Sequence, residues 1–112
     1  MRISIVTPAT RYENLIEIYK SIFEQEIPES VQPSWKIIFD IRPLKDLPIE
    51  VLKLSQDPRV TIDYIEDPTN VVGKAQLNKA IDEMADDEWM YVLDDDNILH
   101  SDWWNNIQPY LN

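Results

Sequence analysis

Three consecutive carboxylates, Asp94, Asp95 and Asp96, directly follow an apolar run from Trp89 to Leu93. Adjacent acids repel one another, so a fold tolerates them best where a cation or a solvated pocket takes up the charge. If the apolar run is a buried strand, the acids lie beyond its carboxyl end, where open α/β sheets bind ligands. This chemistry favours a hard cation, Mg2+ or Mn2+, and a ligand that carries phosphate. For the acids alone, a solvated acidic loop explains the pattern equally well.

Composition restricts the class of protein. The 112 residues are 44% hydrophobic and include four tryptophans, which indicates one folded domain with a real core. Of Trp103 and Trp104, we expect one to anchor the core and the other to be half exposed. The 21 acidic and 10 basic residues give a net charge of −11, so nucleic acid is a poor candidate partner.

Cysteine is absent, which excludes disulfides and thiolate ligands. No apolar run is long enough for a signal peptide or a transmembrane segment, so we expect a soluble, cytoplasmic protein.

Strand and helix patterns alternate along the chain. Strands are predicted for Arg2 to Thr7, Trp35 to Ile41, Val60 to Ile65 and Trp89 to Leu93. Helices are predicted for Tyr12 to Gln25, Gly73 to about Ala85, and Asp102 to about Tyr110 with Ser101 as N-cap, together with a short helix from Ile49 to Leu54. This alternation predicts a single α/β domain over residues 1–112, with right-handed crossovers and a mainly parallel four-stranded sheet. Because the chain has one glycine, glycine-rich phosphate loops are excluded.

Four segments carry a resemblance to a known family. They are Ile3-Ser4-Ile5-Val6-Thr7-Pro8, Lys36-Ile37-Ile38-Phe39-Asp40, the helix from Gly73 to Ile81, and Trp89 to Trp103, which reads WMYVLDDDNILHSDW. Together they resemble the nucleotide-binding half of GT-A glycosyltransferases, in particular the large inverting family with a DXD motif. The resemblance covers nearly the whole chain and implies a GT-A fold in a minimal or truncated form.

The resemblance implies transfer of a sugar from a nucleotide-diphosphate sugar, UDP- or GDP-linked, to an unknown acceptor, with Mn2+ or Mg2+ as cofactor. The residues that it assigns to the nucleotide sugar are Thr7, Pro8, Asp40, Lys74, Asn78, Asp94 and Asp95. The residues that it assigns to the metal are Asp96 and Asp94. Structural roles explain several of these positions equally well, because Asp40 could cap a strand end and Asn78 could contact a loop. Lys74 could be a solvated surface charge, and His100, which follows the acids, fits a structural hydrogen bond better than a ligand role.

The chain departs from the family pattern at two positions that carry charge. Leu77 stands where many relatives have an arginine, and Arg42 could supply compensating charge after the second strand. The catalytic base is not identified, since the remaining acids, Glu66, Asp67 and Asp102, cannot be placed from sequence.

Two functions of different classes therefore stay open. The first is a glycosyltransferase, and the second is a non-catalytic nucleotide-sugar or metal-nucleotide binding module that needs a partner chain. A second copy in a homodimer could complete the site.

Overall fold

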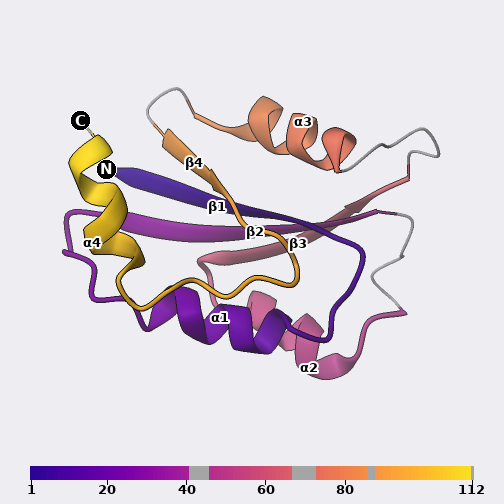
Figure 1. Cartoon of the computed structure of the whole chain (residues 1–112). Helices are drawn as coiled ribbons and strands as arrows, with labels where there is room; N and C mark the ends of the chain where they lie inside the picture. The colour runs from indigo at the N-terminus through magenta and orange to yellow at the C-terminus, as the bar shows by residue number, and fades with distance from the viewer. Residues whose placement is uncertain (41–45, 67–72, 86–87, 112) are drawn as a thin grey trace.

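The computed structural model of the chain describes residues 1–40, 46–66, 73–85 and 88–111 (Figure 1). Its elements are β1 (Arg2–Ala9), α1 (Leu15–Phe23), β2 (Gln32–Asp40), α2 (Ile49–Leu52), the 3-10 helix η2 (Lys53–Gln56), β3 (Val60–Ile65), α3 (Lys74–Glu83), β4 (Glu88–Val92), α4 (Trp103–Ile107) and the 3-10 helix η3 (Gln108–Tyr110). The predicted Ile41, Arg42 and Asp67 lie outside the described residues.

The four strands form one sheet in the order β3-β2-β1-β4, and every pair of neighbours is parallel. This confirms the α/β class and the parallel sheet. Figure 1 shows α1 and α2 on one face of the sheet and α3 on the other. That arrangement follows from right-handed crossovers, because β1, β2 and β3 step in one direction across the sheet and β4 returns to the opposite side of β1.

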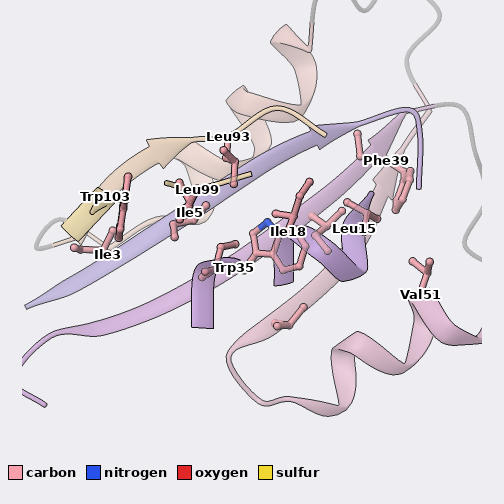
Figure 2. Packing of buried hydrophobic residues seen from close by; sticks show 14 of the residues in the cluster. Ile3, Ile5, Leu15, Ile18, Trp35, Phe39, Val51, Leu93, Leu99 and Trp103 are labelled. Carbon is pink, nitrogen blue, oxygen red and sulfur yellow. The ribbon is translucent and has the colours of Figure 1, made fainter. Parts of the chain in front are cut away.

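The main core lies between the sheet and α1. Figure 2 shows Trp35 and Phe39 of β2 directed toward Leu15 and Ile18 of α1, and all four side chains are fully buried. The residues of α1 that face the core recur at helical spacing, which is why this segment forms an amphipathic helix. The other face of the sheet carries a much smaller buried cluster, made of Val6, Ile38 and Ala80.

Both Trp103 and Trp104 are buried, so the expectation that one of them is half exposed is wrong. The Trp103 ring packs edge-on against Tyr91 of β4, with 5.3 Å between ring centroids. Edge-to-face packing of this kind joins α4 to the edge strand of the described sheet. The tryptophan pair therefore anchors the segment that follows the three acids.

All four predicted helices are shorter in the structure, since α2 is α-helical only over Ile49–Leu52 and α3 spans Lys74–Glu83. The first spans Leu15–Phe23 instead of Tyr12 to Gln25, and the Leu15 N–H donates to the Tyr12 carbonyl in a turn before the helix. The last is α-helical only from Trp103 to Ile107 and continues as a 3-10 turn containing Pro109, which has no N–H to extend the α-helical hydrogen bonds. Asp102, and not Ser101, occupies its N-cap position.

Candidate functional site

The carboxyl ends of all four parallel strands lie on one edge of the sheet. β1 continues toward β2 on one side, and β4 lies on its other side, so the strand order reverses between β1 and β4. Open α/β sheets bind ligands at such a reversal, beyond the strand ends. The three acids that follow β4 lie at this position, since the Leu93 N–H donates to the Val6 carbonyl at 2.9 Å and extends the ladder up to the acids.

Asp95 is the buried member of the acidic run. Its side chain is 8% exposed, and Oδ2 accepts the backbone N–H groups of Thr10 and Arg11, each at 2.9 Å. Oδ1 accepts from the Arg11 guanidinium at 3.0 Å. Asp95 therefore fixes the loop after β1 to the loop after β4, across the point where the strand order reverses.

The charge on Asp95 is stabilised by these partners. Burial alone would raise the pKa of the Asp95 carboxyl, but the Thr10 and Arg11 N–H groups and the Arg11 guanidinium hold that pKa below its ordinary value. In turn, the hydrogen bond to Asp95, with the charges of Asp95 and Asp96, raises the pKa of Arg11. The pair stays ionised at neutral pH.

Asp94 and Asp96 differ from Asp95 because both are exposed to solvent. Asp96 Oδ2 lies 3.2 Å from the Arg11 guanidinium, and half of its side-chain surface remains accessible. The Asn97 N–H donates to the Asp94 carbonyl at 3.2 Å, which turns the chain directly after the acids. The run thus contains one carboxylate directed into the protein and two that a ligand can reach.

Helix α1 holds the segment that follows the acids. The Ser21 hydroxyl accepts the Leu99 N–H at 3.1 Å, and the Gln25 amide donates to the His100 carbonyl at 2.8 Å. The exposed His100 ring accepts the Asp102 N–H at 3.1 Å through Nδ1, which is the local structural role that its position suggested.

The predicted residues at the end of β1 have different environments. Thr7 is fully buried on the α1 face, and its hydroxyl accepts the Trp35 indole N–H at 2.8 Å. This hydroxyl therefore faces the core, and a direct ligand contact through it, as expected from the resemblance, does not fit its burial. Pro8 is half-buried on the opposite face beside Gly73, where a Cβ on the glycine would lie 2.9 Å from the Pro8 Cβ.

Gln76 is a site-forming residue that sequence reasoning missed. Its buried side-chain amide donates to the Ala9 carbonyl at 3.1 Å and to the Ile38 carbonyl at 2.8 Å, so it ties α3 to the ends of two strands. The available signal was a polar residue four positions before Ala80 on the sheet-facing side of a helix. A buried amide in that position needs backbone partners.

Lys74 and Asn78 are exposed on α3, four residues apart and about opposite to the side that carries Gln76 and Ala80. Asp40 ends β2, half-buried and on the same edge as the acids, with β1 between them. The structure thus gathers Asp94, Asp95 and Asp96 with the loop after β1, places Asp40 one strand further along, and turns the two α3 residues toward solvent.

A divalent cation such as Mg2+ or Mn2+ needs oxygen ligands. Among the described residues, no group of three or more His, Cys, Asp or Glu side chains converges as a cage for a metal ion. Mg2+ and Mn2+ use one or two carboxylates together with ligand phosphates, and the exposed Asp94 and Asp96 fit that arrangement. The residues therefore fit a metal that binds together with a phosphate ligand.

Comparison with known proteins supports the fold. No protein-family model matches the chain, and no curated protein matches it. The crystal structure of Staphylococcus aureus TarS 1–349, a glycosyltransferase, is similar with a TM-score of 0.66 and 14% sequence identity. The match covers 98% of this chain and 32% of the TarS chain, so the chain spans about one third of that structure. The chain has a glycosyltransferase-like fold.

No helix in the described ranges is long and apolar enough to cross a membrane.

Proposed function

We propose that this chain is the donor-binding portion of a glycosyltransferase, which binds a UDP- or GDP-sugar beyond the carboxyl ends of β1 and β4 for transfer to an acceptor. The observation that carries the proposal is the acidic run where the strand order reverses. The glycosyltransferase-like fold supports it.

The three acids divide the work in this proposal. Asp96 and Asp94 are the exposed carboxylates that would hold Mn2+ or Mg2+ and contact the donor. When bound, the cation supplies charge neutralisation for the leaving nucleoside diphosphate. Asp95 positions the loop after β1, because both of its oxygens accept hydrogen bonds from that loop.

Residues around the acids would orient the donor. Asp40 is proposed to accept a hydrogen bond from the base, and Pro8 to pack near the ribose. Lys74 is the first residue of α3 and directly follows Gly73, which lies beside Pro8. Asn78 is a weaker candidate, since it lies one helical turn further from Gly73 than Lys74 does.

The test is calorimetric titration with UDP and GDP, each with Mn2+ and with EDTA. We expect binding that depends on Mn2+, because metal and diphosphate each lower the electrostatic penalty that the other meets beside the carboxylates. Asp96→Asn should weaken this binding, while the matched variant Asp102→Asn should leave it unchanged. Equal affinity in EDTA would contradict a bridging metal, and no binding of either nucleotide would contradict the proposed function.

A non-catalytic binding module is the second candidate, and one observation favours it. Within the described residues, Glu66 follows β3, which is three strands away from β4. Strands lie about 4.8 Å apart, so Glu66 is roughly 14 Å across the sheet from the acidic run. An acid at that distance cannot take a proton from an acceptor hydroxyl at the donor sugar.

A further inference from the structure

The acidic run already contacts one cation of the protein, Arg11. Its guanidinium lies 3.0 Å from Asp95 Oδ1 and 3.2 Å from Asp96 Oδ2, so it bridges the buried carboxylate and an exposed one. Arg11 lies in the loop between β1 and α1, 84 residues away from Asp95 in the sequence. Its side chain is 56% exposed even with both contacts in place.

We propose that Arg11 is an internal counter-ion that competes with a divalent cation for Asp96 and transfers to the donor diphosphate when metal and donor bind. This inference rests on the proposed function. It makes Arg11 a residue that sets the metal dependence of the site, a role that the sequence pattern did not suggest.

Competition follows from the geometry at Asp96. A Mn2+ or Mg2+ ion sits roughly 2.1 Å from a carboxylate oxygen, and Asp96 Oδ2 already faces the guanidinium at 3.2 Å. Two cations on one carboxylate repel each other, so the metal gains full access to Asp96 only when the guanidinium moves away.

The backbone contacts of Arg11 allow this movement without loss of the loop. Asp95 Oδ2 binds the Arg11 backbone N–H at 2.9 Å, and the same oxygen binds the Thr10 N–H. The main chain is therefore fixed by contacts that do not involve the guanidinium, whereas the exposed side chain can rotate about its own torsions. A planar guanidinium pairs with phosphate oxygens through two parallel N–H bonds, so a diphosphate beside Asp96 offers it a new partner.

The experiment measures Mn2+ binding by electron paramagnetic resonance, without nucleotide, for the wild type, Arg11→Gln and Arg11→Lys. We expect Arg11→Gln to bind Mn2+ about threefold to tenfold more tightly, because the competing charge is gone. Arg11→Lys keeps the charge and should stay near the wild type. Lys20→Gln, which removes one positive charge from the exposed side of α1, is the matched control and should change the affinity by less than about twofold.

A second titration, of UDP and GDP at saturating Mn2+, tests the transfer to phosphate. Here Arg11→Gln should bind nucleotide at least about fivefold more weakly than the wild type, and Arg11→Lys should be intermediate because it lacks the fork. Thermal unfolding of each variant verifies that it is folded. If Arg11→Gln is unfolded, Arg11→Lys tests the transfer to phosphate, since weaker nucleotide binding than in the wild type supports it and unchanged binding contradicts it.

The outcomes separate the two proposals. Unchanged or weaker Mn2+ binding by folded Arg11→Gln overturns the competition, even when the wild type binds nucleotide and metal together. Unchanged nucleotide binding by the folded Arg11 variants overturns the transfer. Failure of the wild type to bind UDP or GDP contradicts the proposed function and the transfer, whereas the Mn2+ arm still decides whether Arg11 and metal compete.

Discussion

The Trp35 indole N–H donates to the Thr7 hydroxyl at 2.8 Å, between the adjacent central strands β2 and β1. Both side chains are fully buried, so this bond gives the Trp35 indole N–H a polar partner inside the core. The contact also decides what the Thr7 side chain does, since a hydroxyl engaged in the core does not face the edge where the acids lie.

Thr7→Val should therefore reduce stability and leave ligand binding intact. Valine has nearly the same shape but cannot accept the indole N–H, so we expect a loss of about 1 to 2 kcal/mol in the free energy of unfolding. Urea denaturation measures this loss, with Thr7→Ser as the control that keeps the hydroxyl. Unchanged stability combined with weaker nucleotide binding would instead make Thr7 a ligand contact.

Gly73→Ala should destabilise the start of α3. Gly73 has a φ of 76°, which residues that carry a Cβ rarely adopt. The Cβ of an alanine at this position would lie 2.9 Å from Pro8 Cβ. We expect a loss of about 1 to 3 kcal/mol, measured by thermal and urea unfolding.

Gly73→Asn separates the two causes of this loss. Asparagine tolerates a positive φ better than alanine but carries the same Cβ toward Pro8. An intermediate loss would assign the effect mainly to backbone conformation, whereas losses equal to that of Gly73→Ala would assign it to the Pro8 contact. No loss in either variant would contradict this description of the α3 start.

Substitutions of the neighbouring residues Asp95 and Asp96 should have different effects on stability. Asp95→Ala leaves two backbone N–H groups and part of the Arg11 charge without their partner, so we expect about 2 kcal/mol of destabilisation. Asp96→Asn removes one exposed ion pair and should change stability by less than about 1 kcal/mol.

Urea unfolding and Mn2+ binding together test this contrast. Asp96→Asn should lose Mn2+ affinity with little change in stability. Unfolding of the protein by Asp96→Asn, together with wild-type stability of Asp95→Ala, would contradict these roles of the two carboxylates.

The sequence predicted the four strands and the position of the acids because these depend on local patterns. Alternating β-branched and aromatic residues mark strands wherever they lie, and three adjacent acids after an apolar run need no partner to be recognised. The sequence could not show that Asp95 is buried and bonded to the loop after β1 while Asp94 and Asp96 are exposed, because Arg11 is 84 positions away from Asp95. Gln76 likewise meets Ala9 across 67 positions, so its role appears only when the strand order is known.

Asp57 should control part of the stability in acid. Its carboxylate accepts Arg59 guanidinium hydrogen bonds at 2.9 and 2.6 Å and the Tyr19 hydroxyl at 2.7 Å. Hydrogen bonding to Arg59, and then to Tyr19, outweighs the opposing effect of burial and lowers the pKa of Asp57 well below its ordinary value. The folded state therefore binds this proton less readily than the unfolded state does.

The sign of the pH dependence follows from that difference. The stabilisation is complete above the unfolded-state pKa of aspartate, about 3.9, and is lost as the pH falls toward the lower pKa of the folded state. Asp57→Asn should lower the free energy of unfolding at pH 7 by about 1 kcal/mol. The decrease of that free energy between pH values of about 5 and 2 should also be less steep than in the wild type. Urea unfolding across this pH range is the measurement, with Asp82→Asn, at an exposed position of α3, as the control. Equal acid slopes for the wild type and Asp57→Asn would contradict the assigned role.

The 112-residue chain should bind donor better than it transfers sugar. Binding uses strand ends and exposed carboxylates that the described structure places together, but transfer also needs a base within about 3 Å of the attacking hydroxyl. Asp102 is the N-cap of α4, and Figure 1 shows α4 at one end of the molecule, to the left of the loop that follows β4. Stabilisation of the leaving group alone supplies only part of the reduction in the activation barrier. We therefore expect slow hydrolysis of a UDP- or GDP-sugar and no acceleration by acceptors. Release of nucleoside diphosphate from a panel of donors, with and without candidate acceptors, measures both rates. Rapid turnover that depends on acceptor would contradict the binding-module alternative and would require a base from this chain or from a second copy.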